Sequence, residues 1–181
     1  MKNFLIIGNK NAAILKDIFP LLINNKVWFG VTSISTFTQS DGTLKKFGNV
    51  GWLTNMDHKL RPKPLKLAQK YTPEKYPKYD NYDAIECSKT KDIPYDYDGV
   101  IGVPVSFIDK YCSEQFEIIG KCENLDLYKL KTKVYSSKEC KQAYFDKFGK
   151  KGVYDLNASG VLIKNGIKEK VFSRILIKRK L

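Results

Sequence analysis

The segment from Tyr76 to Ile85, YPKYDNYDAI, sets three tyrosines three residues apart among a lysine, an asparagine and two aspartates. Tyrosine rings together with amide and carboxylate groups form an adaptable hydrogen-bonding surface. Pro77 excludes a helix, and so aromatic a segment is not typical of a disordered linker. We therefore expect an ordered loop. Two interpretations stay open: a surface that recognises a ligand, or a loop stapled internally by its own hydroxyls and carboxylates.

Positive charge is the second feature with chemical consequences. The 181 residues include 32 lysines and arginines against 19 acidic residues, a formal net charge of +13. Such a chain favours polyanions as partners, although solubilising lysines give the same total. Two basic clusters are candidates for phosphate contacts, which supply affinity without sequence information, and the alternative for both is an uncommitted solvated surface. They are Lys59, Arg61, Lys63 and Lys66 in one loop, and Arg174, Lys178, Arg179 and Lys180 in the tail, where alternation predicts that Arg174 and Lys178 point outward.

Several catalytic and metal-binding patterns are missing. His58 is the single histidine, so a Ser-His-Asp triad has no support from spacing. The four cysteines lie ten or more residues apart without a CxxC pair, which predicts free buried thiols rather than a zinc site or disulfides. The turn GNKNAA after the first apolar run has one glycine, Gly8, and is not a dinucleotide or phosphate loop.

The N-terminal part reads as alternating strands and helices. The run NFLIIGN predicts a buried strand, residues 11–24 predict a helix with a kink or early stop at Pro20, and KVWFGV predicts a second strand. Strand, helix and strand in this order predict a parallel βαβ unit. Residues 33–55, with a turn at SDGT, predict antiparallel additions to that sheet.

The remaining chain mixes loops with a few clear elements. We expect a short helix at residues 65–70, a packed turn and a strand after Val100, and a helix between Ser136 and Gly149 with Glu139 in its first turn. Asn165-Gly166 between apolar stretches predicts a hairpin. Hydrophobic residues make up 43% of the chain, enough for the core of one domain. No run is long enough to span a bilayer and the N-terminus is no signal peptide, so we expect a cytoplasmic protein without a membrane partner.

Particular stretches resemble a known family. The opening run to KVWFGV, then WLTNMDH, YPKYDNYDAI, KTKDIP, GVPVSF and RILIK are similar, in this order, to the C-terminal part of EcoRI-type adenine-specific DNA methyltransferases. The weakest similarity is in the loop after His58 and in residues 121–153. The resemblance implies an α/β fold: residues 1–58 as the C-terminal half of a Rossmann-like methyltransferase sheet with antiparallel strands, and residues 59–181 as a target-recognition region, together one compact unit.

The same resemblance implies a function for which this chain lacks two of the required motifs. The complete enzyme uses S-adenosylmethionine to methylate adenine N6 within double-stranded DNA, in a type II restriction–modification system, and must extrude the base to reach it. The family's Asn-Pro-Pro-Phe motif and cofactor segment do not occur here. We therefore expect this chain to be inactive alone and to bind no S-adenosylmethionine by itself. Three origins stay open: an expression fragment, the remnant of a broken gene, or one part of a split enzyme that has its N-terminal catalytic half on a separate chain. Alternatives are a DNA-binding module without a methylation role, and a fragment that folds but binds nothing.

Some site residues follow from the resemblance. Phe37 is similar in placement to the family's aromatic residue that stacks on an extruded adenine, with Trp52 as second choice; both have core packing as the alternative. Asn81 can pair with an adenine edge, and Lys78 or Lys89 can approach guanine or phosphate.

Overall fold

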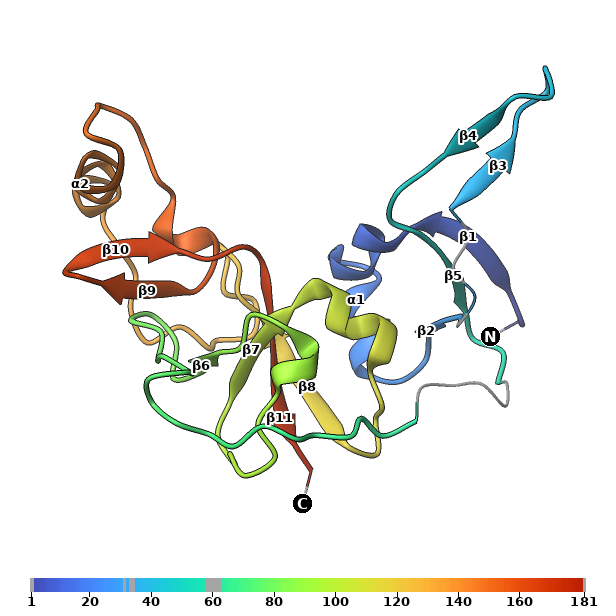
Figure 1. Cartoon of the computed structure of the whole chain (residues 1–181), viewed down its shortest axis with the longest axis horizontal. Helices are drawn as coiled ribbons and strands as arrows, with labels where there is room; N and C mark the ends of the chain where they lie inside the picture. Colours follow the sequence, from blue (N-terminus) through green and yellow to red (C-terminus); the bar gives the residue numbers. More distant parts are fainter. Residues whose placement is uncertain (1, 31, 33–34, 58–62, 181) are drawn as a thin grey trace. The chain divides into compact units, whose positions relative to one another are not determined.

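The computed structural model describes residues 2–30, 32, 35–57 and 63–180, and these form two compact units (Figure 1). Unit 1 comprises Met1–Leu65 and Ile108–Glu114, and unit 2 comprises Lys66–Phe107 and Gln115–Leu181. The division that we expected after residue 58 stays a prediction. Within the described residues no helix is both long enough and apolar enough to cross a membrane.

Unit 1 contains a three-stranded sheet of β1 (Leu5–Asn9), β5 (Val50–Thr54) and β2 (Trp28–Phe29), in that order. Both outer strands are antiparallel to β5, so β1 and β2 run in the same direction but do not pair. The parallel orientation predicted for these two strands is confirmed, although β5 lies between them. The antiparallel additions are confirmed, although β3 (Thr36–Thr38) and β4 (Leu44–Lys46) form a hairpin of their own.

Two short helices replace the one predicted for residues 11–24. A 3₁₀ helix covers Lys10–Ile14, and α1 covers Phe19–Ile23. Pro20 lies in the first turn of α1 and does not end it, because that position has no helical hydrogen bond for its missing N–H to make. Phe19 and Leu22 are buried and form the inner face of α1.

Strand β1 is not buried, contrary to the prediction from its apolar run. Leu5, Ile6 and Ile7 are 52%, 55% and 41% exposed. The strand lies at the edge of its sheet, and because successive side chains point to opposite faces, their exposure means that the described residues leave both faces of β1 partly uncovered. An apolar edge strand of this kind is a ready template for pairing with more chain.

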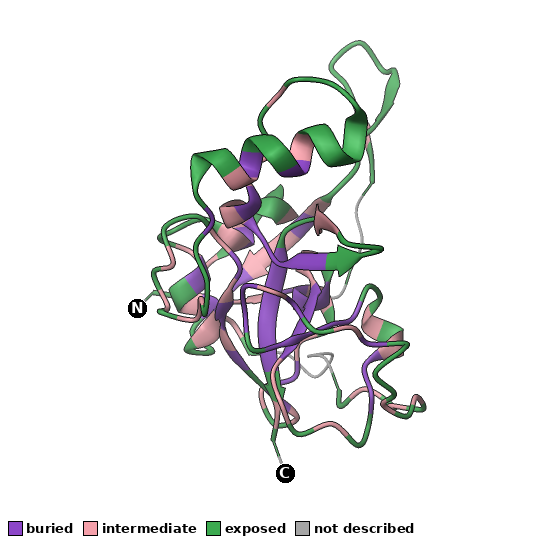
Figure 2. Cartoon of the chain, turned by 90° about the vertical axis from the view of Figure 1, so that its left-hand side faces the viewer, coloured by how far each residue is buried: buried purple, intermediate pink, exposed green. Residues whose placement is uncertain are grey.

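The core of unit 2 is a four-stranded sheet in the order β6-β7-β11-β8. Its strands are β6 (Ile85–Glu86), β7 (Ile101–Pro104), β11 (Arg174–Arg179) and β8 (Phe116–Lys121). The pairs are antiparallel except β6 with β7. Figure 2 shows the strands as largely buried, and β11 is buried along its first four residues because it is central and covered on both faces.

A helix and a hairpin complete unit 2, and both confirm the sequence predictions. Helix α2 (Ser137–Phe148) begins with a capping box of Ser136 and Glu139 and ends at Gly149, which has φ 65°. Strands β9 (Val161–Lys164) and β10 (Ile167–Lys170) meet at Asn165 and Gly166 with φ of 51° and 78°. Cys140 and Ala143 of α2 pack in a cluster with Tyr135, Leu156 and Val161.

Further 3₁₀ helices cover Thr90–Asp92, Val105–Lys110 and Leu156–Ala158, so the turn predicted after Val100 is confirmed. The helix predicted for residues 65–70 is wrong, because Gln69 pairs in an extended conformation with Pro94. The four cysteines are free and buried, as expected. The fold is thus mixed α/β with small, mostly antiparallel sheets, and the predicted Rossmann-like sheet is not seen among the described residues.

Candidate nucleic-acid interface

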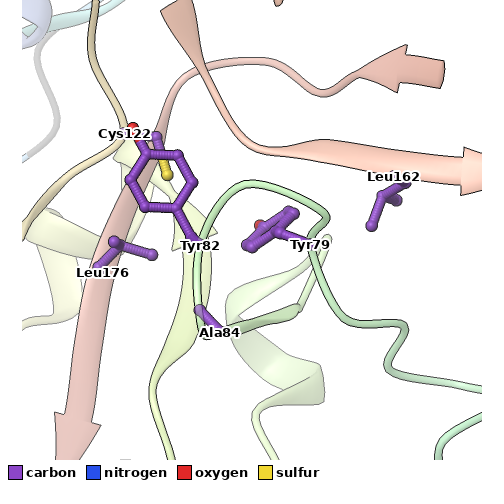
Figure 3. Close-up of a cluster of buried hydrophobic side chains, with 6 residues drawn as sticks. All are labelled: Tyr79, Tyr82, Ala84, Cys122, Leu162 and Leu176. Carbon is purple, nitrogen blue, oxygen red and sulfur yellow. The ribbon is translucent and has the colours of Figure 1, made fainter. Parts of the chain in front are cut away.

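The three tyrosines of the tyrosine-rich segment lie in the interior of unit 2, whereas Lys78 and Asp83 of the same segment are exposed. Tyr76, Tyr79 and Tyr82 are 2%, 6% and 2% exposed. Figure 3 shows Tyr79 and Tyr82 in a buried cluster with Ala84, Cys122, Leu162 and Leu176. The ring of Tyr79 also lies against Gly102 and Gly160, where a Cβ on either glycine would overlap it. The ordered loop that we predicted is confirmed.

Asn81 staples this loop to the start of β9. Its Nδ2 donates to the carbonyl of Ser159 at 2.9 Å, and its Oδ1 accepts from the N–H of Val161 at 2.8 Å. The residue has no exposed surface. Both ends of the amide are therefore occupied within the protein, which favours the internal-staple interpretation over pairing with an adenine edge.

Arg174 belongs to a buried ion pair, so its predicted outward orientation is wrong. Its Nη2 lies 2.6 Å from Oε1 of Glu86 and its Nε lies 3.0 Å from Oε2. Tyr79 donates its hydroxyl proton to the same carboxylate. Burial, followed by the negative charge of Glu86, raises the pKa of the Tyr79 hydroxyl well above its usual value, which keeps the donor protonated. The alternation of apolar and basic residues did not predict the orientation of Arg174 correctly, because β11 is a central strand and its first four residues are all buried.

Positive charge is also concentrated in another stretch of unit 2. Residues 131–170 contain ten lysines and four acidic residues, a net charge of +6 within 40 positions. They include α2, the loop after it and the β9–β10 hairpin. Nearly half of the chain's net charge of +13 therefore lies in less than a quarter of its length. A field of this sign and density attracts polyanions.

Some of these lysines are committed to internal contacts. Lys133 lies 2.7 Å from Asp80, and Lys147 and Lys164 lie 3.3 Å and 3.4 Å from Glu169. Lys168 and Lys170 extend over the rings of Tyr135 and Tyr154. These contacts fix the hairpin and α2 and leave less of their charge available for a ligand.

Other lysines form a basic groove, which we define by residues Lys138, Lys141, Gln142, Phe145, Lys151, Gly152 and Val153. The first four follow helical spacing along the outer face of α2, opposite the buried Cys140 and Ala143. The groove has a volume of about 650 Å³. Within the described ranges no acidic side chain lies at ion-pair distance from its three lysines. Phe145 and Val153, which are 52% and 67% exposed, give it an apolar floor.

This combination suits a nucleic-acid strand. Ammonium groups on both sides of the groove can each neutralise a phosphate, and the apolar floor can contact sugars or bases. Gly152 lies against the ring of Tyr144, where a side chain would overlap, so the wall formed by residues 151–153 packs closely on α2. Clusters of neighbouring lysines in the sequence do not reveal this groove, because its lysines come from two separate segments. The net charge of +6 over residues 131–170 indicates a basic region, but other stretches of the chain are as positive, so it does not locate the groove.

The remaining predicted residues are dispersed. Lys59 and Arg61 lie outside the described residues. Lys63 in unit 1, and Lys66, Lys78, Lys89, Lys178 and Lys180 in unit 2, are exposed, and Arg179 is half-buried. Lys78 has Asp83 at 4.0 Å. The groove includes none of them.

The two aromatic candidates for base stacking lie on different strands of unit 1. Phe37 is half-buried on β3 and meets Phe47 edge to face, with ring centroids 5.4 Å apart. Trp52 is half-buried on β5, and its Cβ lies close to Gly30, where an added Cβ would approach it to 2.9 Å. Neither is part of the basic groove.

Comparison with known proteins identifies relatives. Residues 1–180 match the family described as adenine-specific methyltransferase EcoRI. The chain is 44% identical to the type II methyltransferase M.EcoRI of Escherichia coli over 145 residues, which are 69% of this chain and 44% of that protein. It is 34% identical to M.MpnI of Mycoplasma pneumoniae, over 74% of this chain and 49% of that protein.

A third relative, M.MgeORF184P of Mycoplasma genitalium, is 32% identical over 68% of this chain and 45% of its own length. The chain thus spans somewhat less than half the length of each of these relatives. No solved structure matches it.

Proposed function

The chain belongs to the EcoRI family of adenine-specific methyltransferases, and from this premise we propose that it supplies DNA binding and target recognition to a site-specific adenine-N6 DNA methyltransferase of a type II restriction–modification system. Its substrate partner is double-stranded DNA. The observation that carries this proposal is the basic groove of α2, with three lysines that have no described acidic partner.

The chemistry of methyl transfer is assigned to residues outside this chain. Neither Asn-Pro-Pro nor Asp-Pro-Pro occurs in the sequence, so the polar acceptors for an adenine amino group are missing from it. We also assign no S-adenosylmethionine site to the described residues. Gly8, at the end of β1, is followed by a 3₁₀ turn, and a Cβ added to it would meet nothing within 4 Å. The turn GNKNAA has one glycine and is not the glycine-rich loop of a cofactor-binding strand–helix turn, and we derive no step through the cofactor.

This proposal requires a catalytic half that carries the residues missing from these 181 positions. Relatives about twice as long as this chain, and the exposed apolar side chains of β1, support a sheet that continues beyond the strands described. The catalytic half supplies the cofactor site, the amino-group acceptors and the methyl transfer. This chain holds the duplex so that the target adenine can be extruded towards that half.

Salt dependence of DNA binding tests the proposal. We expect the purified chain to bind a mixed-sequence duplex oligonucleotide at low salt, with an affinity that falls linearly on a log–log plot against salt concentration. Replacing Lys138, Lys141 and Lys151 together by alanine is expected to reduce the slope by about 0.9 for each lysine that neutralises a phosphate. Fluorescence anisotropy at a series of salt concentrations measures both quantities.

The matched control is the triple replacement of the same lysines by arginine, which keeps the charge and is expected to retain the slope. A wild-type chain whose binding does not depend on salt, or an alanine variant with the wild-type slope, contradicts the proposal. Calorimetric titration with S-adenosylmethionine provides a second measurement. Binding of the cofactor by this chain alone is incompatible with our assignment of the cofactor site to the catalytic half.

A further inference from the structure

Phe172 is the most exposed large hydrophobic residue in the described part of the chain. It lies between β10 and β11 in unit 2, and 90% of its surface is accessible. An isolated, partly exposed apolar residue is ordinary on a protein surface. A phenylalanine that is almost completely exposed, within a segment whose backbone is fixed, is a less ordinary arrangement.

The main chain at Phe172 is held from several sides. Its carbonyl oxygen accepts from Ser159 Oγ at 2.9 Å and from Arg174 Nη1 at 3.2 Å. The N–H of Val171 donates to the carbonyl of Gly160 at 3.0 Å. Ser159 and Arg174 are themselves 2% and 8% exposed. The segment is therefore anchored in the core while the ring projects outward.

The buried ion pair reinforces this anchor. Arg174 uses Nη2 and Nε for Glu86 and Nη1 for the carbonyls of Phe172 and Ser173. One guanidinium thus connects the central sheet to the projecting residue. A group presented on a rigid backbone loses little conformational entropy when it binds, which is the main advantage of a preorganised contact.

The surrounding charge indicates what the ring contacts. Phe172 lies two positions after the end of the lysine-rich residues 131–170, whose net charge of +6 draws a polyanion to this unit. In such a setting an exposed aromatic ring has a defined use: it stacks on a base, or inserts between two base pairs and partly unstacks them.

We propose that Phe172 is a base-stacking wedge, which inserts against a base of the DNA duplex bound by unit 2 and is held in position by Ser159, Arg174 and Glu86. This inference rests on the proposed DNA binding. It adds a stacking contact, which contributes to the affinity for DNA without neutralising a phosphate. Because partial unstacking lowers the cost of extruding a neighbouring nucleotide, the wedge also assists the step that adenine methylation requires.

Phe172→Ala is the first test, with Leu125→Ala as its control, because Leu125 is an exposed apolar residue of the same unit at 79%. Loss of one stacked base is expected to weaken binding of a mixed-sequence duplex by about 5- to 150-fold. The salt slope is expected to stay at its wild-type value, since no charge is removed. Leu125→Ala is expected to bind like the wild type.

Phe172→Trp provides a direct readout. Stacking of an indole on a base quenches its fluorescence, so this variant is expected to lose emission when duplex is added, while Leu125→Trp and the wild-type chain change much less. If the wild-type chain shows lysine-dependent DNA binding but Phe172→Ala binds equally well and Phe172→Trp is not quenched, the wedge is refuted and the proposed function stands. If the wild-type chain binds no DNA, both are refuted.

Discussion

Arg174 and Glu86, 88 residues apart in the sequence, form a bidentate ion pair inside unit 2, with Nη2 to Oε1 at 2.6 Å and Nε to Oε2 at 3.0 Å. The pair joins the first residue of β11 to the last residue of β6, two strands that are separated by β7 in the sheet. Both side chains are at most 9% exposed. A buried pair of this kind fixes the arrangement of the elements that it connects, because neither charge has another partner of comparable strength.

Removal of one member of the ion pair is expected to lower the free energy of unfolding strongly. Glu86→Ala leaves the Arg174 guanidinium buried and unpaired, and we expect the free energy of unfolding to fall by about 3–5 kcal/mol. Urea denaturation followed by circular dichroism measures the change. The double variant Glu86→Ala with Arg174→Met removes both charges and is expected to recover part of the loss. A single variant as stable as the wild type would show that water reaches the pair freely.

Asn81 separates the two interpretations of the tyrosine-rich segment. Asn81→Ala leaves the buried N–H of Val161 and the carbonyl of Ser159 without their partners, and we expect a loss of about 2–4 kcal/mol of stability. Lys78→Ala, at an exposed position in the same loop, is expected to change stability by less than about 0.5 kcal/mol. If Asn81→Ala instead kept its stability and lost DNA affinity, the residue would be a base reader and not a staple.

Local signals in the sequence were sufficient where one short stretch determines the structure. The capping box at Ser136 and Glu139, the left-handed Gly149 and the Asn165-Gly166 turn specify α2 and the last hairpin through their own backbone geometry. The order of YPKYDNYDAI and its neighbours indicated the family without any structure.

Long-range pairing was not predictable in the same way. The apolar run at Leu5–Asn9 has the composition of a buried strand. The exposure of its side chains, however, depends on which distant segments pack on the two faces of the strand. The alternation in β11 predicted an outward Arg174, whereas the side chain is paired with a residue 88 positions away. The lysines of the basic groove come together because α2 turns its outer face to the following loop, which no spacing within either segment reveals.

The exposed edge strand predicts self-association of the isolated chain. We expect Ile6→Lys, which places a charge on β1, to reduce self-association in light scattering, because charged side chains block edge-to-edge pairing. Its free energy of unfolding is expected to stay within about 0.5 kcal/mol of the wild-type value, since Ile6 is 55% exposed. Leu125→Lys, in a loop without a strand edge, is the control, and an equal effect of both variants would mean that β1 has no special role.

Alkaline pH provides a test of the packing around the tyrosine cluster. Burial raises the pKa of the Cys122 thiol from 9.0 to about 12. The thiol therefore ionises in the unfolded chain before it ionises in the folded one, so its effect on stability is absent below pH 9 and becomes destabilising as the pH rises from 9 towards 12. In that window one such thiol lowers the free energy of unfolding by about 1.4 kcal/mol per pH unit.

Cys122→Ala is expected to lack this contribution, so urea unfolding at pH values from 8 to 11 should show a shallower alkaline decline for the variant than for the wild type. Lysines and tyrosines titrate in both proteins and cancel in the comparison. The thiol is also expected to react slowly with a thiol-specific reagent at pH 8 and rapidly in urea, because the thiolate is the reactive form. Parallel pH profiles, together with a fast reaction in the folded protein, would place Cys122 in contact with solvent.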